Sequence, residues 1–171
     1  MAKGWRAVVA GTLLALGLGV SAPPARGVES DPLPVPKGGA RERAVTAYNA
    51  GVKLMLDKRY AAAQQKFEEA LAADERLAEA HNNLAFSLRM QSVANRERAL
   101  KHYNRALELK PRLAQAYMYR GVLFTQMGDL ARARADHAKL VTLDRQLAAK
   151  LERIIAGAGR DDGDGLAPQY D

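Results

Sequence analysis

Small residues that recur every 34 to 36 positions constrain the fold of this chain more than any other feature. Three sets of positions share separations of 34 and 36 residues in one order or the other: Gly51, Ala85 and Gly121; Ala63, Ala99 and Ala133; and Phe67, Tyr103 and His137. A period of this length is typical of stacked supersecondary units, each of which buries one face against its neighbour. The sequence therefore predicts a repeat protein.

Each unit carries two helical patterns, because its apolar residues recur at spacings of three and four positions. Six helices are predicted in this way, over about 41–55, 60–71, 80–91, 98–109, 114–127 and 130–143. Glycine tolerates positive φ and aspartate caps helices, so Gly128-Asp129 favours a turn between the last two. The chain is thus expected to form three helix hairpins whose small residues let paired helices approach closely.

These units resemble tetratricopeptide repeats, whose first helix carries a leucine beside a small residue and whose second helix carries an alanine followed four positions later by an aromatic residue. The matching residues are Gly51, Leu54, Ala63, Phe67 and Ala70 in the first unit; Leu84, Ala85, Leu88, Ala99, Tyr103, Ala106 and Pro111 in the second; and Tyr117, Gly121, Phe124, Ala133 and Leu140 in the third. The resemblance implies an all-α, right-handed α-solenoid, with repeats at about 44–77, 78–113 and 114–147.

The match to the family pattern has departures. They are Ala47 and His81 in place of a large aromatic residue, His137 in place of an aromatic residue, and Glu75 and Arg145 in place of proline. The middle unit is also longer, which fits an insertion in the turn at 92–96. A longer surface turn costs little free energy, so we expect the stack to be undisturbed.

A seventh helix is predicted over 145–156, where Leu147, Leu151, Ile154 and Ile155 share one side. The last unit of a solenoid exposes an apolar face that must be covered by an element with a polar outer surface. We therefore interpret 145–156 as a cap that completes a helical domain over 41–157. The glycine- and aspartate-rich residues 158–171 are expected to form a loose acidic tail.

Residues 1–27 have the features of a secretory signal peptide. A basic start at Lys3 and Arg6 precedes an apolar stretch over 7–20, and Ala25-Arg26-Gly27 supplies small residues before a cut at Val28. The apolar stretch is shorter than the roughly 20 residues that span a bilayer. We expect export to the bacterial periplasm, with an uncleaved N-terminal membrane anchor as the alternative.

Residues 28–40 link the signal to the helical domain. They contain Pro32, Pro34 and Pro36, and proline biases its predecessor toward extended backbone. The segment is predicted to be a semi-rigid tether without a core of its own. Docking of this segment on the helical domain is the alternative, although nothing in its composition requires it.

Composition and motifs offer no candidate for catalysis. The 171-residue chain has no cysteine, which excludes disulfides, thiolate zinc sites and thiol nucleophiles. Its formal charge of +7, which would fall to +4 without the signal, is ordinary for a helical protein. His81, His102 and His137 have no partner ligands at helical spacing, and the acidic run at 161–165 lacks the glutamate that completes a calcium loop. We expect no enzyme activity, cofactor or metal.

The family resemblance also implies a binding surface, because first helices of successive tetratricopeptide units line a concave groove that holds a peptide or a partner helix. The positions assigned to this groove are Tyr48, Val52, Met55, Asn82, Phe86, Arg89, Met118, Val122 and Thr125. We expect an apolar patch that suits leucine-like anchors, with Arg89 as its main charge. Contact of some of these residues with the proline-rich segment or the cap helix is the alternative.

A carboxylate clamp, which some family members use to grip a peptide C-terminus, is not expected. Asn83 matches one member of that set, but Tyr48, Val52, Gln115 and Tyr119 occupy the other positions.

The leading hypothesis is a non-catalytic adaptor or scaffold that binds another protein in the groove, as a monomer or weak oligomer in the bacterial envelope. A second is a binder of nucleic acid or another anionic polymer through Arg96, Arg98, Lys101, Arg105, Arg132, Arg134 and Lys139, although acidic residues interleave with these cations. A third is a structural protein that self-assembles end to end, which the cap helix opposes. We expect neither a nucleic-acid partner nor a membrane span after signal cleavage.

Overall fold

The computed structural model of this protein describes residues 31–158. In this range lie the helices α1 (Gly39–Leu56), α2 (Tyr60–Ala73), α3 (Ala78–Gln91), η1 (Val93–Asn95), α4 (Arg96–Leu109), α5 (Ala114–Gln126), α6 (Leu130–Leu143) and α7 (Arg145–Ala158). Every predicted helix is present, with its ends within two residues of those expected. The predicted signal at 1–27 and the acidic tail beyond residue 158 lie outside the described residues. None of the helices described has the length and apolarity needed to cross a bilayer.

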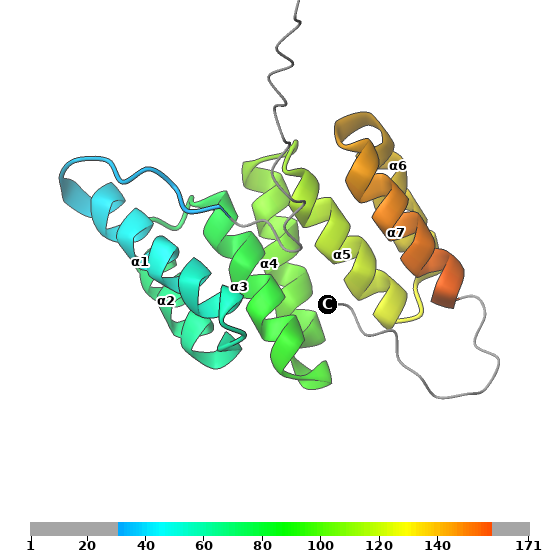
Figure 1. Ribbon diagram of the computed structural model, residues 1–171, viewed down its shortest axis with the longest axis horizontal. Coiled ribbons are helices and arrows are strands. Elements are labelled where there is room, and N and C mark those ends of the chain that lie inside the picture. The colour runs from blue at the N-terminus through cyan, green and yellow to red at the C-terminus, as the bar shows by residue number, and fades with distance from the viewer. Residues whose placement is uncertain (1–30, 159–171) are drawn as a thin grey trace, which may run out of the picture.

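The helices form three hairpins that stack side by side, followed by one further helix (Figure 1). Each α-helix packs against the next one along the chain, and α1 also contacts α3, α3 contacts α5, and α5 contacts α7. The helices α1, α3, α5 and α7 therefore make one layer, the odd layer, and α2, α4 and α6 make the other. This arrangement is the predicted all-α solenoid of three tetratricopeptide-like hairpins and a terminal helix.

The recurring small residues lie where helices come closest. Gly51, Ala85 and Gly121 are all buried. A Cβ atom added at Gly51 would lie 2.6 Å from a ring carbon of Phe67 in α2, and one added at Gly121 would lie 2.5 Å from a methyl carbon of Leu151 in α7. A larger side chain would push these helices apart, which is the physical reason for the repeated glycine and alanine.

Helix α7 covers the end of the stack as predicted. Ala148, Leu151 and Ile155 are buried, whereas Lys150 and Glu152 are exposed on the opposite side. Because α7 contacts both α5 and α6, it closes the apolar face that the third hairpin would otherwise present to water.

The longer turn of the middle hairpin is the short helix η1 at Val93–Asn95. The Ala94 N–H donates to the Ser92 Oγ at 3.2 Å, and Val93 is 67% exposed. The extra residues thus protrude from the surface while α3 and α4 remain packed together, as an insertion in a turn predicts.

The proline-rich segment differs from the expectation of a free tether. Helix α1 begins at Gly39, and residues 31–38 run back along α1 as far as Asn49 (Figure 1). The Leu33 side chain packs, half-buried, against the core of the first two hairpins. The alternative of docking on the helical domain is therefore the observed one. Its cause is a contact between Leu33 and Asn49, which are 16 positions apart.

Candidate functional site

Asn49 holds the backbone of the docked segment on the surface of α1. The Leu33 N–H donates to Asn49 Oδ1 at 2.7 Å, and Asn49 Nδ2 donates to the Leu33 C=O at 2.8 Å. A side-chain amide carries one acceptor and a donor group in the same arrangement as a peptide bond. The contact therefore recognises an extended backbone and leaves the side chain of the bound residue to be selected by its surroundings.

A shallow cavity of about 380 Å³ lies beside this contact. Residues 33–36 form one wall, and Arg41 and Val45 of α1 form the other. Val45 is four positions before Asn49, so the two side chains stand one helical turn apart on the same side of α1. The site thus combines a backbone-binding amide with an apolar wall and, at the rim, an arginine whose guanidinium pairs with Asp74.

Asn49 has counterparts in the other two hairpins. Asn83 follows it by 34 residues and Tyr119 follows Asn83 by 36, which are the separations of the small residues. Asn83 accepts a hydrogen bond from Asn82 Nδ2 at 3.0 Å and donates one to the Tyr48 hydroxyl at 3.1 Å. A row of polar side chains therefore crosses the odd layer at equivalent places on α1, α3 and α5.

The Tyr48 hydroxyl in this row remains protonated. Burial raises its pKa above the ordinary value, and the negative charges of Glu79 and Asp31 add to the rise, while the hydrogen bond from Asn83 lowers it. Asp31 acts on Tyr48 because the docked segment brings its carboxylate to this side of α1. The contribution of Asp31 is the smallest of these, after those of burial, Glu79 and Asn83.

Arg89 lies in a group of aromatic rings near the middle of the odd layer. Its guanidinium carbon is 5.2 Å from the Phe86 ring centroid, and the Phe86 centroid is 5.0 Å from that of Tyr119. Arg89 Nη1 donates to Gln126 Oε1 at 3.4 Å, and its charge lowers the pKa of Tyr103, which burial raises to about 12. The buried Nε makes no hydrogen bond of good geometry within the described residues. Its electrostatic partner is the Tyr103 hydroxyl, which is buried as well and likewise makes no hydrogen bond of good geometry within the described residues.

Most of the nine first-helix positions assigned to the groove are buried. Eight of them are only 1–7% exposed: Tyr48, Val52, Met55, Asn82, Phe86, Met118, Val122 and Thr125. The ninth, Arg89, is half-buried. The apolar members belong to the hydrophobic core, since their side of each helix turns toward neighbouring helices. Accessible residues lie further round the same helix, as with Asn49 and Leu56, the latter 56% exposed. A partner contact by the nine residues stays a prediction.

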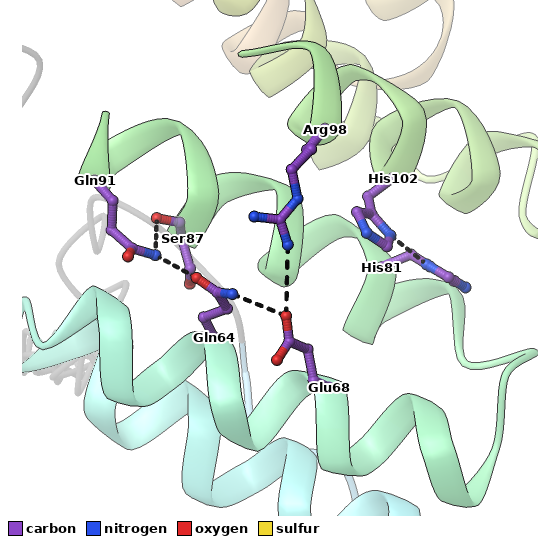
Figure 2. A network of polar contacts seen from close by, with 7 residues as sticks. All are labelled: Gln64, Glu68, His81, Ser87, Gln91, Arg98 and His102. Carbon is purple, nitrogen blue, oxygen red and sulfur yellow. Dashed lines mark hydrogen bonds and ion pairs between the residues drawn. The ribbon is translucent and has the colours of Figure 1, made fainter. Parts of the chain in front are cut away.

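Two histidines that lie far apart in the sequence contact each other in the middle hairpin. His81 of α3 and His102 of α4 stack with ring centroids 5.2 Å apart, and their Nδ1 atoms are separated by 3.0 Å (Figure 2). His81 Nε2 lies 3.0 Å from the Glu75 carbonyl, so a neutral His81 donates there and its Nδ1 accepts from His102. Helical spacing does not predict this pair, because the two residues lie on different helices. Assignment of both histidines to facing helices of one hairpin could have predicted it.

Both imidazoles favour the neutral form. Burial lowers the pKa of His81, and burial together with the adjacent His81 lowers the pKa of His102 to about 4. Within residues 31–158, no three histidine, aspartate or glutamate side chains are grouped so that they could hold a metal ion. The pair is therefore best interpreted as a packing contact between α3 and α4.

A chain of polar contacts ties α2 to the middle hairpin beside this pair (Figure 2). Gln91 Nε2 donates to Gln64 Oε1 at 2.9 Å, and Gln64 Nε2 donates to Glu68 Oε1 at 2.8 Å. Arg98 of α4 approaches Glu68 at 3.8 Å. These partners satisfy one another, so the contacts stabilise the junction between the first and second hairpins.

Part of the basic surface considered for an anionic partner is neutralised by ion pairs. The pairs are Arg98 with Glu68 at 3.8 Å, Arg105 with Glu108 at 2.9 Å, and Arg132 with Asp129 at 2.6 Å. Exposed pairs of this kind are typical of a solvated charged face.

Solved tetratricopeptide domains share the fold of this chain. It is similar to the first such domain of Spaghetti (RPAP3) bound to the HSP90 peptide SRMEEVD, with a TM-score of 0.62 and 21% identity over 68% of this chain and 93% of that one. For the second domain of Spaghetti with the same peptide, the TM-score is 0.56 at 25% identity, covering 60% and 94%. For the tetratricopeptide domain of Arabidopsis OM64 the score is 0.64 at 19% identity, covering 70% and 98%.

Sequence comparison adds little to this assignment. No model of a known protein family matches the chain. A segment of 48 residues, 28% of this chain, is 40% identical to UDP-N-acetylglucosamine–peptide N-acetylglucosaminyltransferase of Giardia intestinalis, but the match spans only 3% of that enzyme. The structural neighbours and the helix packing together show that the chain has the fold of a tetratricopeptide-repeat domain.

Proposed function

We propose that this protein is a non-catalytic adaptor that binds an extended segment of another protein across the odd layer of its helical stack. The observation that carries the proposal is the pairing of Asn49 with the backbone of Leu33. One side-chain amide there holds both the N–H and the C=O of an extended residue. The surface of α1 therefore already has the geometry that a peptide requires.

The surroundings of Asn49 favour an apolar partner segment. Leu33 packs against the core beside it, and Val45 lines the adjacent cavity. Leu56 lies seven positions after Asn49, two helical turns further along the same side of α1, and is 56% exposed. Apolar groups on either side of a backbone-binding amide suit hydrophobic anchors of an extended peptide.

The structural neighbours support peptide binding by this fold, since both domains of Spaghetti (RPAP3) are bound to the HSP90 peptide SRMEEVD. The chain nevertheless carries Tyr48, Val52, Gln115 and Tyr119 at positions where a carboxylate-gripping tetratricopeptide domain has cationic and amide side chains. We therefore infer a partner that is recognised through its backbone and apolar side chains rather than through a C-terminal carboxylate.

The proposed setting is the periplasm of a bacterial cell, on the basis of the signal features of residues 1–27. Fractionation of cells that make a C-terminally tagged chain tests this part separately. Release of the tagged protein with the periplasmic fraction, with a mass lower by the signal, is the expected result. Retention in the membrane fraction at full mass would favour the uncleaved anchor.

Site-specific photocrosslinking tests the adaptor role. A benzophenone amino acid is placed at Leu56 on the odd layer, or at Val141 on α6 as a matched control, since Val141 is also an exposed aliphatic residue at 49%. We expect a covalent adduct with another protein in the native cell from position 56 and much less from position 141. Equal labelling from both positions, or no adduct from position 56, would contradict the proposal.

A further inference from the structure

We propose that residues 31–36 of this chain are an internal occupant of the peptide site on α1, which a partner segment of similar chemistry must displace. The inference rests on the proposed function, because it assigns a competitor to the same surface. It also defines the partner: an extended segment with an apolar residue next to proline, as in Leu33-Pro34.

The contacts of Leu33 are those of a bound peptide. The Leu33 N–H donates to Asn49 Oδ1 at 2.7 Å, and Asn49 Nδ2 donates to the Leu33 C=O at 2.8 Å. The Leu33 side chain packs against the core of the first two hairpins. Of the residues after it, Pro34 is exposed and Val35 is 49% exposed, whereas Pro36 is half-buried and lines the cavity beside Arg41 and Val45. Leu33 is thus the one anchor with a paired backbone, and Pro36 adds an apolar contact.

The segment is held weakly enough to leave. Its described hydrogen bonds to the helices are the two at Asn49, and Pro34 and Pro36 have no N–H with which to add more. Beyond it, the Gly38 N–H donates to Glu42 Oε2 at 2.6 Å, which fixes the start of α1 independently of Leu33. Departure of residues 31–36 would therefore expose Asn49 without unravelling the helix.

The short connection to α1 explains why a weak contact suffices to fill the site. A flexible tether of a few residues keeps its end at an effective concentration on the order of millimolar. A free segment with the same contacts would have to reach a similar concentration to compete. A physiological partner must therefore bind more tightly than Leu33 does, by adding contacts beyond Asn49.

The site beyond Asn49 offers such additional contacts. The cavity of about 380 Å³ is not one of them, because it lies between residues 33–36 and the part of α1 that precedes Asn49, and the internal segment forms one of its walls. Leu56, two helical turns beyond Asn49 on the same side of α1 and 56% exposed, is an apolar contact available to a longer segment. The internal segment, by contrast, gains its main contacts at Leu33.

A binding experiment with the chain's own segment as the probe tests this inference. A fluorescent peptide of residues 31–37, Asp-Pro-Leu-Pro-Val-Pro-Lys, is titrated with the full chain and with the full-chain variant Leu33→Asp, which frees the site. Fluorescence anisotropy should give a dissociation constant at least about tenfold lower for Leu33→Asp than for the unmodified chain. The double variant Leu33→Asp with Asn49→Ala should lose this gain.

Control measurements distinguish binding at the Asn49 site from non-specific binding of the peptide. The same peptide with aspartate in place of its leucine should bind none of the chains measurably. Circular dichroism should show that all variants retain the helix content of the unmodified chain, and Asn49→Gln offers a second disruption of the amide geometry. Equal affinity of the unmodified chain and Leu33→Asp would overturn the inference, as would a gain that survives both changes at Asn49.

The outcome can be distinguished from that of the adaptor proposal. Crosslinking from position 56 together with equal peptide affinities would mean that the chain is an adaptor whose segment does not compete. Absence of crosslinking together with the predicted gain for Leu33→Asp would mean that the internal contact is real and the adaptor role is wrong.

Discussion

Two surfaces of the helical stack are covered, one by helix α7 and one by the segment 31–36, and the two covers differ. At the C-terminal end of the stack, α7 lies against α5 and inserts the fully buried Leu151 over Gly121. On α1, near the N-terminal end, a short extended segment covers Asn49 with one half-buried leucine and two hydrogen bonds. A helix with several buried anchors is part of the cooperative core, whereas a segment with one anchor opens independently of it.

If the proposed function holds, this difference gives the solenoid one closed end and one surface that a partner can use. The cover at the C-terminal end closes the apolar face of the third hairpin. On the proposed function, the segment on α1 covers the apolar peptide site until a partner segment displaces it. The following tests compare the two covers, from the largest expected effect to the smallest.

Truncation of the leucine in each cover gives the largest contrast. Leu151→Ala should lower the free energy of unfolding by about 2–5 kcal/mol, because a fully buried leucine leaves a cavity. Leu33→Ala should lower it by about 1 kcal/mol or less, since Leu33 is half-buried on a separable segment. Urea unfolding followed by circular dichroism measures both. Similar losses would mean that the segment belongs to the cooperative core.

Addition of a methyl group at each of the two glycines compares helix packing within the first hairpin with packing under α7. Gly51→Ala places a carbon 2.6 Å from the buried Phe67 ring, and we expect a loss of about 1–3 kcal/mol despite the better helix propensity of alanine. Gly121→Ala meets a methyl group of Leu151, which can shift together with the terminal α7, so its loss should be smaller. Chemical denaturation of both variants measures these losses. A larger loss for Gly121→Ala than for Gly51→Ala would mean that α7 is the more rigidly held element.

The histidine pair adds a pH-dependent test in the hairpin between the two covers. Both folded pKa values are lowered, so the unfolded chain binds more protons below the ordinary histidine pKa of about 6.5. Stability should therefore fall by roughly 1–2 kcal/mol as the pH decreases from about 6.5 toward 4, with a discount for partial exposure. Urea midpoints at several pH values measure this loss.

The control for the pH test is His102→Gln, which removes one of the two titrating rings. Its stability should depend less on pH over the same interval, while carboxylate titrations remain common to both chains. Parallel pH profiles for the variant and the unmodified chain would show that the pair does not resist protonation.

Removal of the backbone-binding amide should have the smallest effect on stability. Asn49→Ala deletes two hydrogen bonds to a separable segment, and we expect a loss of about 1 kcal/mol or less in the free energy of unfolding. Proteolysis should show the change more clearly than denaturation, because the released residues 31–36 become accessible while α1 stays folded. A loss comparable to that of Leu151→Ala would place Asn49 in the core instead.

The helical architecture could be predicted from the sequence because it depends on periodic residues. Gly51, Ala85 and Gly121 are buried in the stack, and each helix follows its own apolar period. The cap could be predicted for the same reason, since Leu151 and Ile155 mark one side of an amphipathic helix. Periodicity fixes which residues face inward and where turns must come.

The binding surface could be predicted only in outline, because it depends on how far each helix turns against its neighbours. A family register assigns Tyr48 and Phe86 to a groove, but at 2% and 5% exposure they lie in the core. The contact of Leu33 with Asn49 joins an aperiodic segment to a helix, and no sequence pattern in the segment or in the helix predicts it. The pairing of His81 with His102 likewise arises from packing across a hairpin.

Amide hydrogen exchange tests the central claim most directly, because it measures the opening of each cover in the unmodified chain. We predict that the Leu33 N–H, bound to Asn49, exchanges at least about a hundredfold faster than the Leu151 N–H within α7. Asn49→Ala should accelerate exchange at Leu33 and leave Leu151 unchanged. Equal protection of the two amides, with loss of both on global unfolding alone, would contradict a displaceable segment on a permanently capped stack.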